Sequence, residues 1–401
     1  MSFFVALSGE NFLMGVIGGQ IRVANIIEDG RLAGPQKRIM MVASSLSKKV
    51  ETKVIFPKKN SEEFRLYCHE SGIKYLPLSL TTMSNNLLSI IKYIVLFPYE
   101  ILILFFVFKK HRFDLVHISG GCWQFKGVIA ARLAKLKIVW HLNATYAPFF
   151  LRKIFSYLSP YANSFIFASE KTKQYYINFI PSKTKNFLIQ SPVDVNFFNP
   201  NLKYSIEELQ KKFLVQNKIV IGTIGNINRN KGHVTFLKTV KLLSSYSKDI
   251  IFLIVGPIYQ SQQKYFNYLE DIIKKEKIKN VYFLHGKKDV RPLLKIIDIY
   301  VCSSDNEASP LSVWEAMSME KAIVSTDVGD VSKFINDGVN GFVVNRKDSQ
   351  GLAERIIKLI EKPELRNDFG KSARLIAKNK LDLNVCANLH TMVYEKTFWK
   401  L

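Results

Sequence analysis

The stretch Glu307-Ala308-Ser309-Pro310-Leu311-Ser312-Val313-Trp314-Glu315 follows a short apolar segment at 298–302. Ser309, Pro310 and Ser312 are typical of a loop and the start of a helix, since Pro suits the first helical turn and Ser accepts hydrogen bonds from free backbone N–H groups. We therefore predict a strand, then a polar loop with Glu307, then a helix that contains Glu315. This order is the building unit of a parallel α/β sheet.

The same unit recurs along the chain, because apolar segments of strand length alternate with helical patterns. The predicted strands are 21–27, 52–56, 114–118, 137–141 and 163–168, then 218–225, 250–256, 280–284, 298–302, 321–325 and 341–344. Between the two series, 192–217 carries Pro192 and Pro200 and is predicted to connect two domains. A chain of 401 residues also exceeds one ordinary core. We predict an α/β fold of two facing, doubly wound parallel-sheet domains, with ligands in the cleft between them.

Glu307 and Glu315 are separated by seven residues, so they can hold a polyhydroxylated ligand at two places. The helix start between them offers unpaired N–H groups and a partial positive charge, which suit a diphosphate. One carboxylate would accept hydroxyls of a ribose and the other those of a sugar. From the residues alone, an acidic loop followed by a solvated Glu is an equal alternative.

Two further loops follow predicted strands. Gly30-Arg31-Leu32-Ala33-Gly34-Pro35-Gln36 has two glycines that allow close backbone approach, although it is not the Gly-x-Gly-x-x-Gly dinucleotide fingerprint. Gly225-Asn226-Ile227-Asn228-Arg229-Asn230-Lys231-Gly232-His233 places two cations above the expected cleft, where they suit a phosphate leaving group. Taken alone, such loop cations are more often solvated.

The segment 307–319 resembles the Glu-x7-Glu motif of retaining GT-B glycosyltransferases of family 4. The resemblance continues through Ala322–Thr326, Val328–Asp330 and Asp337–Phe342, and it covers about 20–375. It implies two Rossmann-like domains, 20–200 for the acceptor and 201–375 for the nucleotide-sugar donor, with a helix in 376–401 that crosses back to the first domain. Residues 1–19 would be an N-terminal extension or the product of a misplaced start, and their composition does not suit a secretory signal.

The resemblance also implies roles for particular residues. Glu315 would hold the ribose, Glu307 the sugar hydroxyls, Lys231 the phosphates, and His141 the sugar or its phosphate. Asn226 stands where the family has an arginine, which Arg229 could replace. The candidate catalytic residues are His141, Glu307 and Lys231. The candidate donor-binding residues are Asn226, Arg229, Lys231, Glu307, Ala308, Ser309, Pro310, Leu311 and Glu315. The candidate acceptor-binding residues are Gly30, Arg31, Gly34 and His117.

The resemblance implies a retaining enzyme that moves a sugar from a nucleotide-sugar to a hydroxyl of a lipid-linked saccharide. The pathway would be that of a bacterial surface polysaccharide, such as O-antigen, capsule or exopolysaccharide. No cofactor and no metal are expected, because no Asp-x-Asp pair is present to hold a cation. The alternatives are a nucleotide-sugar epimerase of GT-B fold and a non-catalytic nucleotide-sugar-binding subunit.

The net charge of +24 is spread over both halves of the chain and suggests an anionic partner. No run of five basic residues forms an arm for nucleic acid, so we expect no nucleic-acid partner and favour an anionic membrane surface over a merely solvated one. The four cysteines are scattered, which predicts reduced thiols. The expected location is therefore cytoplasmic and peripheral on the inner face of the cytoplasmic membrane.

Residues 87–108 are the most apolar part of the chain and are followed by Lys109-Lys110-His111-Arg112. Lys92, Pro98 and Glu100 interrupt the run, which argues against a single membrane span. Two interpretations remain equal, a buried helix pair in the first domain and an interfacial segment that dips into a bilayer beside a basic rim.

Overall fold

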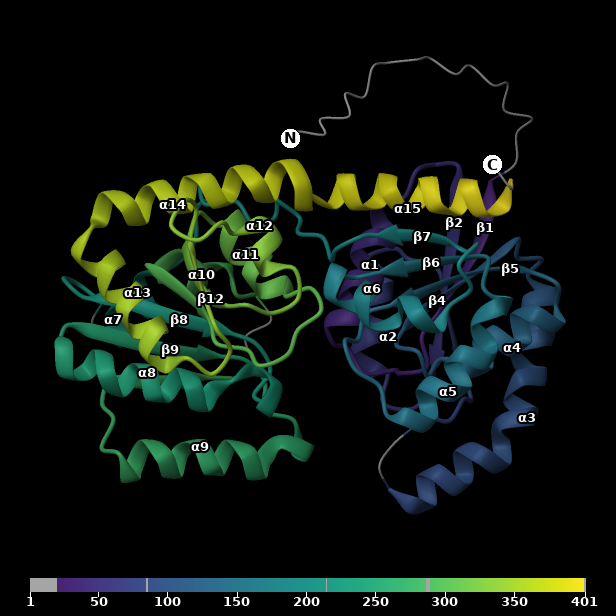
Figure 1. Cartoon of the computed structure of the whole chain (residues 1–401), viewed down its shortest axis with the longest axis horizontal. Coiled ribbons are helices and arrows are strands. Elements are labelled where there is room, and N and C mark those ends of the chain that lie inside the picture. Colours follow the sequence, from purple (N-terminus) through teal and green to yellow (C-terminus); the bar gives the residue numbers. More distant parts are fainter. Residues whose placement is uncertain (1–19, 84–85, 214, 286–288, 400–401) are drawn as a thin grey trace, which may run out of the picture.

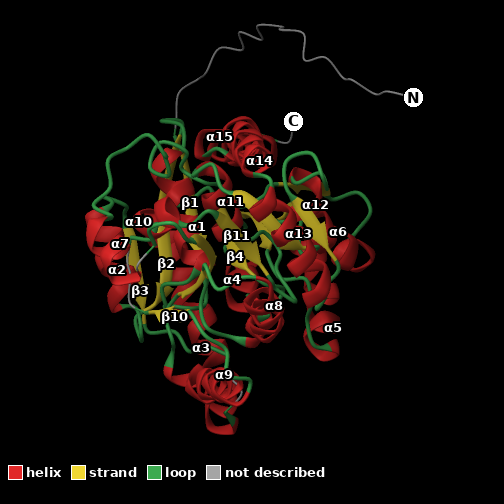
Figure 2. Ribbon diagram, turned by 90° about the vertical axis from the view of Figure 1, so that its left-hand side faces the viewer, coloured by secondary structure: helices red, strands yellow, loops and turns green. Residues whose placement is uncertain are grey.

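The computed structural model describes residues 20–399, apart from 84–85, 214 and 286–288. The predicted extension at 1–19 lies outside the described residues. The chain forms two α/β domains that lie side by side (Figure 1), and helices cover both faces of each sheet (Figure 2). The strands within each sheet are parallel.

The first domain has a seven-stranded sheet in the order β3-β2-β1-β4-β5-β6-β7. Its strands are β1 (Ile21–Ile26), β2 (Val50–Pro57), β3 (Tyr75–Leu78), β4 (Leu115–Gly120), β5 (Lys137–Leu142), β6 (Ser164–Phe167) and β7 (Lys185–Leu188). Its helices are α1 (Gly34–Ser45), α2 (Glu62–Glu70), α3 (Leu87–Lys110), α4 (Phe125–Leu133), α5 (Phe149–Leu158) and α6 (Glu170–Tyr176).

The second domain has a six-stranded sheet in the order β10-β9-β8-β11-β12-β13. Its strands are β8 (Ile219–Ile224), β9 (Ile250–Val255), β10 (Val281–Leu284), β11 (Ile299–Cys302), β12 (Ala322–Thr326) and β13 (Phe342–Val344). Its helices are α7 (Glu207–Phe213), α8 (His233–Tyr246), α9 (Gln263–Lys275), α10 (Arg291–Ile296), α11 (Leu311–Ser318), α12 (Val331–Phe334), α13 (Ser349–Glu361) and α14 (Pro363–Ile376).

Each strand predicted from the sequence is present, and most of them are central parallel strands, which are buried on both faces and form continuous apolar runs. In β9, for example, all six residues are buried. The sequence did not predict β3 and β7. Both are short edge strands with half-buried side chains, and Pro77 in β3 suits only an edge.

The strand order reverses between β1 and β4 in the first sheet and between β8 and β11 in the second. In a doubly wound fold this reversal opens a crevice at the carboxyl ends of the strands, where ligands bind. The loops after β1, β8 and β11 carry the glycine, lysine and glutamate motifs predicted to form the site. The topology thus brings these motifs to the edges where the two domains face each other.

The chain crosses between the domains twice. The first crossing follows β7, and the second joins α14 to α15 (Leu383–Phe398) through a π-helical turn at Ala377–Leu381. The two crossings are tied together, since Val193 N donates to Leu381 O at 2.9 Å and Leu383 N donates to Val193 O at 3.0 Å. Beyond this point α15 packs on α1, β5 and β1 of the first domain (Figure 1).

Helix α3 differs from the predicted helix pair. It is one continuous helix from Leu87 to Lys110 that includes Pro98, capped at its start by the Asn86 side chain. One face, with Tyr93, Leu104 and Phe108, is buried and packs on α4. By length and composition alone α3 could cross a membrane, but its packing on α4 makes it part of the first domain.

Candidate active site

A lysine–glutamate ion pair joins the two loops of the second domain that carry the predicted donor motifs. Lys231 Nζ lies 2.6 Å from Glu307 Oε1, and both side chains are mostly buried. Ser304 Oγ donates to the same oxygen at 3.2 Å. Burial by itself would lower the pKa of Lys231, but the charge of Glu307 and its hydrogen bond raise this pKa above 10.5. Lys231 is therefore a fixed positive charge in the loop after β8.

Two glycines in left-handed conformations hold these loops against their neighbours. Gly232 has φ +63°, and a Cβ there would lie 1.9 Å from Ser303 O, so only glycine lets the Lys231 loop pack on the segment after β11. Gly329 has φ +52°, and a Cβ there would lie 2.2 Å from Ala308 O. Both close contacts fix the backbone on either side of Glu307.

Glu315 lies in α11, as predicted, one helical turn after Leu311. Burial raises the pKa of Glu315, while the positive charges of Lys37 and Lys231 oppose that rise. Lys37 belongs to α1 of the first domain, so the carboxylate faces cations from both domains. Lys37 was not among the predicted site residues, because no local sequence pattern indicates its contact with a residue so far along the chain.

The loop before α11 is also held by the first domain. Thr145 Oγ1 donates to Asn306 Oδ1 at 2.5 Å, and Ser191 N donates to Ser309 Oγ at 2.9 Å. The predicted donor residues 307–311 therefore lie against segments that follow β5 and β7. Gly34 approaches the same place, since a Cβ on it would lie 3.8 Å from Leu311 Cδ1.

Asp330 is a buried carboxylate that joins the domains, and it was not among the predicted site residues. Its Oδ1 accepts from Glu170 N at 2.8 Å and its Oδ2 accepts from Gln190 Nε2 at 2.7 Å. The partners lie 160 and 140 residues away, so no local pattern indicates the contact. Lys171 adds an ion pair of 2.9 Å with Asp327.

His141 and His117 lie on neighbouring strands and are fully buried. His141 is the second-last residue of β5, and its Nε2 atom has no hydrogen-bond partner in the part of the chain that the structure describes. His117 lies within β4, with its Nε2 3.3 Å from His141 Nδ1. His117 and His141 thus contact each other within the core, and the predicted acceptor role of His117 stays a prediction.

The other predicted site residues lie less close to the ion pair. Arg229 is exposed, with its guanidinium 5.3 Å from the centre of the Tyr265 ring of α9. Arg31 is exposed and bound to Asp29 of its own loop, at 2.8 and 3.1 Å. A Cβ on Gly30 would lie 2.7 Å from Pro57 O, so this glycine packs on the end of β2.

Asn226 and Pro310 stand at the backbone turns of the two donor loops. Asn226 O accepts from Asn228 Nδ2 at 3.2 Å, and Pro310 is the residue that precedes α11. Neither contact involves the ion pair.

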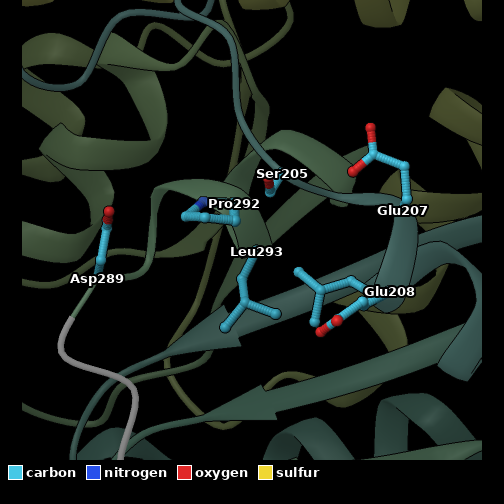
Figure 3. Close-up of a pocket in the computed structure, with 7 residues that line it drawn as sticks. Ser205, Glu207, Glu208, Asp289, Pro292 and Leu293 are labelled. Carbon is cyan, nitrogen blue, oxygen red and sulfur yellow. The ribbon is translucent and has the colours of Figure 1, made fainter.

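A separate pocket lies between α7 and α10 (Figure 3), and neither residue of the ion pair lines it. Glu207, Glu208 and Asp289 line it, and their carboxylates do not converge (Figure 3). No group of three or more His, Cys, Asp or Glu side chains within the described ranges is arranged to hold a metal ion.

Two α/β domains with parallel, doubly wound sheets define the GT-B class. The structure of HepE from Anabaena in complex with UDP and glucose superposes with a TM-score of 0.80 at 19% identity, covering 93% of this chain and 99% of that one. The fold predicted from the sequence is confirmed.

The family follows from the sequence comparison, in which residues 205–376 match the family model "Glycosyl transferases group 1". The second domain belongs to this family, and the chain is a glycosyltransferase. Over 380 residues it is 24% identical to N,N'-diacetylbacillosaminyl-diphospho-undecaprenol alpha-1,3-N-acetylgalactosaminyltransferase of Campylobacter jejuni, covering 90% of this chain and 94% of that protein. It is 25% identical over 338 residues to UDP-Gal:alpha-D-GlcNAc-diphosphoundecaprenol alpha-1,3-galactosyltransferase of Escherichia coli, covering 78% and 83%.

Proposed function

We propose that this glycosyltransferase retains the anomeric configuration and moves a sugar from a nucleotide-sugar to a hydroxyl of a lipid-linked saccharide. The product would enter a bacterial surface polysaccharide. The observation that carries the proposal is the Lys231–Glu307 pair beside the start of α11, held against the first domain through Asn306 and Ser309. A cation, a carboxylate and the start of α11 meet there, where the two domains contact each other.

These groups suit a nucleotide-sugar. Negative charge builds up on the diphosphate as the glycosidic bond breaks, and Lys231 together with the N-terminal amides of α11 would stabilise that charge. Glu307 would accept hydrogen bonds from the sugar hydroxyls, and Glu315 from the ribose. Lys37 is a second cation within reach of the same region. We propose that this arrangement stabilises the leaving group without a metal ion.

The relatives support the choice of acceptor. The names of the Campylobacter jejuni and Escherichia coli proteins specify sugars joined to undecaprenol through a diphosphate, and both matches extend over most of this chain. We therefore propose a polyprenyl-diphosphate saccharide as acceptor, bound on the first domain. Such a lipid stays in the membrane while its saccharide enters the cleft, so the enzyme must work at the membrane surface.

Helix α3 provides a surface for that contact. Its outward face carries an apolar stripe at helical spacing, in which each side chain is at least half exposed: Leu88, Ile91, Val95, Tyr99, Leu102 and Phe106. Such a continuous exposed stripe is unusual for a water-facing helix. Lys92, Lys109 and Lys110 are exposed on the same helix, which suits anionic headgroups. We propose that α3 lies on the inner face of the cytoplasmic membrane.

Sedimentation with liposomes tests this surface. Wild-type protein should bind liposomes with anionic lipid more than neutral ones and should be partly released by salt, because salt screens surface charge. Replacing Leu88, Val95 and Phe106 by Ser should weaken binding, whereas replacing the exposed Leu242 and Leu375 of the second domain should not. Phe105 is not a suitable target, since it packs partly against the core. Equal recovery of the α3 variant and wild type would rule out the surface.

The reaction itself is tested with purified protein, a panel of nucleotide-sugars and a short-chain polyprenyl-diphosphate saccharide. Donor-dependent glycolipid with the donor's anomeric configuration, read by NMR, supports the proposal. Product of inverted configuration would refute retention. A free epimer would instead indicate an epimerase, and donor binding without turnover a non-catalytic subunit.

A further inference from the structure

A chain of buried side chains runs from the C-terminal helix to His141. Tyr394 of α15 places its hydroxyl 2.6 Å from His117 Nδ1, and His117 Nε2 lies 3.3 Å from His141 Nδ1. All three side chains are fully or almost fully buried. The chain therefore connects three elements, α15, β4 and β5, that lie far apart in the sequence.

The Tyr394 hydroxyl determines which atom donates in each hydrogen bond between Tyr394, His117 and His141. Within the described residues, its hydroxyl has one hydrogen-bond partner, His117 Nδ1. If His117 Nδ1 carried a proton, the hydroxyl would have to accept, and its own hydrogen would remain unpaired in the core at a cost. The hydroxyl therefore donates to His117 Nδ1. A neutral imidazole carries one N–H, so the proton of His117 is on Nε2 and is donated to His141 Nδ1.

Burial and the neighbouring groups keep His117, His141 and His390 neutral. His390 of α15 lies beside both rings, at 5.9 and 6.0 Å between centroids. Its Nδ1 is 2.8 Å from Cys386 O and its Nε2 is 2.7 Å from Arg38 Nη2, so Nδ1 donates and Nε2 accepts. Burial lowers the pKa of His117 and of His141 well below 6.5, and the nearby Arg38 charge lowers both further.

We propose that Tyr394 and His117 are positioning residues that keep the proton of His141 on Nε2, so that His141 donates a hydrogen bond to the sugar of the donor. The proposal rests on the proposed function, since the donor loop that carries Glu307 contacts the loop after β5 through Asn306 and Thr145. It also gives the C-terminal helix, which packs on β5, a part in the site. His141 Nε2 is the one end of the chain that has no partner within the described residues, and it lies two residues before the loop that contacts Asn306 through Thr145.

The histidine tautomers can be observed without turnover. In protein labelled with 15N-histidine, long-range proton–nitrogen spectra show which ring nitrogen carries the proton, and His141 is assigned by its absence in His141→Gln. Wild-type His141 should be protonated on Nε2. Tyr394→Phe removes the donor and should shift His141 wholly or partly to the Nδ1-protonated form. Tyr176→Phe, at another fully buried tyrosine of the first domain, should leave it unchanged.

Kinetics separate this role from packing. Tyr394→Phe should lower kcat about fivefold, the effect of weakening one hydrogen bond, with little change in KM for the acceptor. In His141→Gln the amide supplies its own N–H, so adding Tyr394→Phe should cause no further loss. A wild-type His141 protonated on Nδ1 would overturn the proposal, as would an equal loss from Tyr394→Phe in the His141→Gln background. If Tyr394→Phe fails to fold, the wild-type spectrum still decides. If glycosyl transfer were absent but the tautomer as expected, only the proposed function would fail.

Discussion

Removing the charge of Lys231 should disable the enzyme with little effect on its fold. Lys231 Nζ lies 2.6 Å from Glu307 Oε1, and the two side chains are 23% and 17% exposed. A pair with this burial lies between a surface ion pair, worth about 0–1 kcal/mol, and a buried one, whose disruption costs about 3–5 kcal/mol. We expect Lys231→Met to lower the free energy of unfolding by about 1 kcal/mol, which is about 2–4 °C in Tm for a domain of this size.

The effect on catalysis should be much larger, because Lys231 meets charge that develops only as the diphosphate leaves. Losing such a contact costs about 2.7 kcal/mol or more, which is at least about a hundredfold in kcat/KM for the donor. Glu307→Gln should also reduce the rate. The double variant should lose less than the sum of the two, with a coupling of about 1–2 kcal/mol, since the side chains contact each other.

The assay is the rate of donor-dependent glycolipid formation at varied donor concentration, with Tm measured on the same samples. Lys238→Met serves as the control, because Lys238 is exposed on α8 and the substitution changes the charge equally. Wild-type kcat/KM in Lys231→Met, or an equal loss in Lys238→Met, would refute the assignment. Additive losses in the double variant would show that the ion pair does not act as a unit.

Three further predictions concern the same molecule. Glu315→Ala should lower kcat/KM at least about a hundredfold, because it removes a charged contact to the ribose. Glu354→Ala, on the exposed face of α13, should leave kcat/KM unchanged. The same glycolipid assay measures both variants, and far-UV circular dichroism checks that they are folded. Activity should survive excess EDTA, and a loss that added magnesium or manganese restores would show that a metal stabilises the leaving group. Burial, and to a smaller extent the charge of Arg38, lower the pKa of His390 from 6.5 to about 3. Below pH 6.5 the unfolded chain therefore binds a proton that the folded chain does not. The free energy of unfolding falls as the pH falls. His390→Gln should reduce that slope by about 1.4 kcal/mol per pH unit between about pH 6 and 4, measured by denaturant unfolding, and identical slopes would contradict the buried neutral state.

The sequence predicted the central strands and the helix with Glu315 because burial on both faces and helix-start chemistry leave local patterns. Pro98 suggested a break in the apolar run, yet α3 continues through it, since packing of Tyr93, Leu104 and Phe108 on the domain does not depend on one backbone hydrogen bond. The edge strands β3 and β7 lack the signal because their side chains are only half buried and Pro77 or polar residues interrupt them, whereas the edge strands β10 and β13 are short runs of apolar residues that each include a buried one.

The candidate site was predictable only in part, for a related reason. Lys231 and Glu307 each lie in a motif that follows a strand, so the topology brings them together. Arg229 lies in the same motif, but its direction depends on Tyr265, a residue of another helix. The contacts of Asp330 and Tyr394 join segments more than a hundred residues apart in the sequence, so no local sequence pattern predicts them.

The paired crossings restrict how the two domains can move. A domain joined to its neighbour by a single connecting segment can rotate about the axis of that segment (twisting) and can also bend at it (swinging). Here Val193 is hydrogen-bonded to Leu381 and Leu383 on both of its sides, so the two crossings act as one short ribbon. Twisting would break these bonds, whereas swinging leaves them intact, and the remaining motion is a hinge rotation. For the domains to open by such a rotation, the contact between Thr145 and Asn306 has to break, so binding of the proposed donor and closure of the domains would be linked.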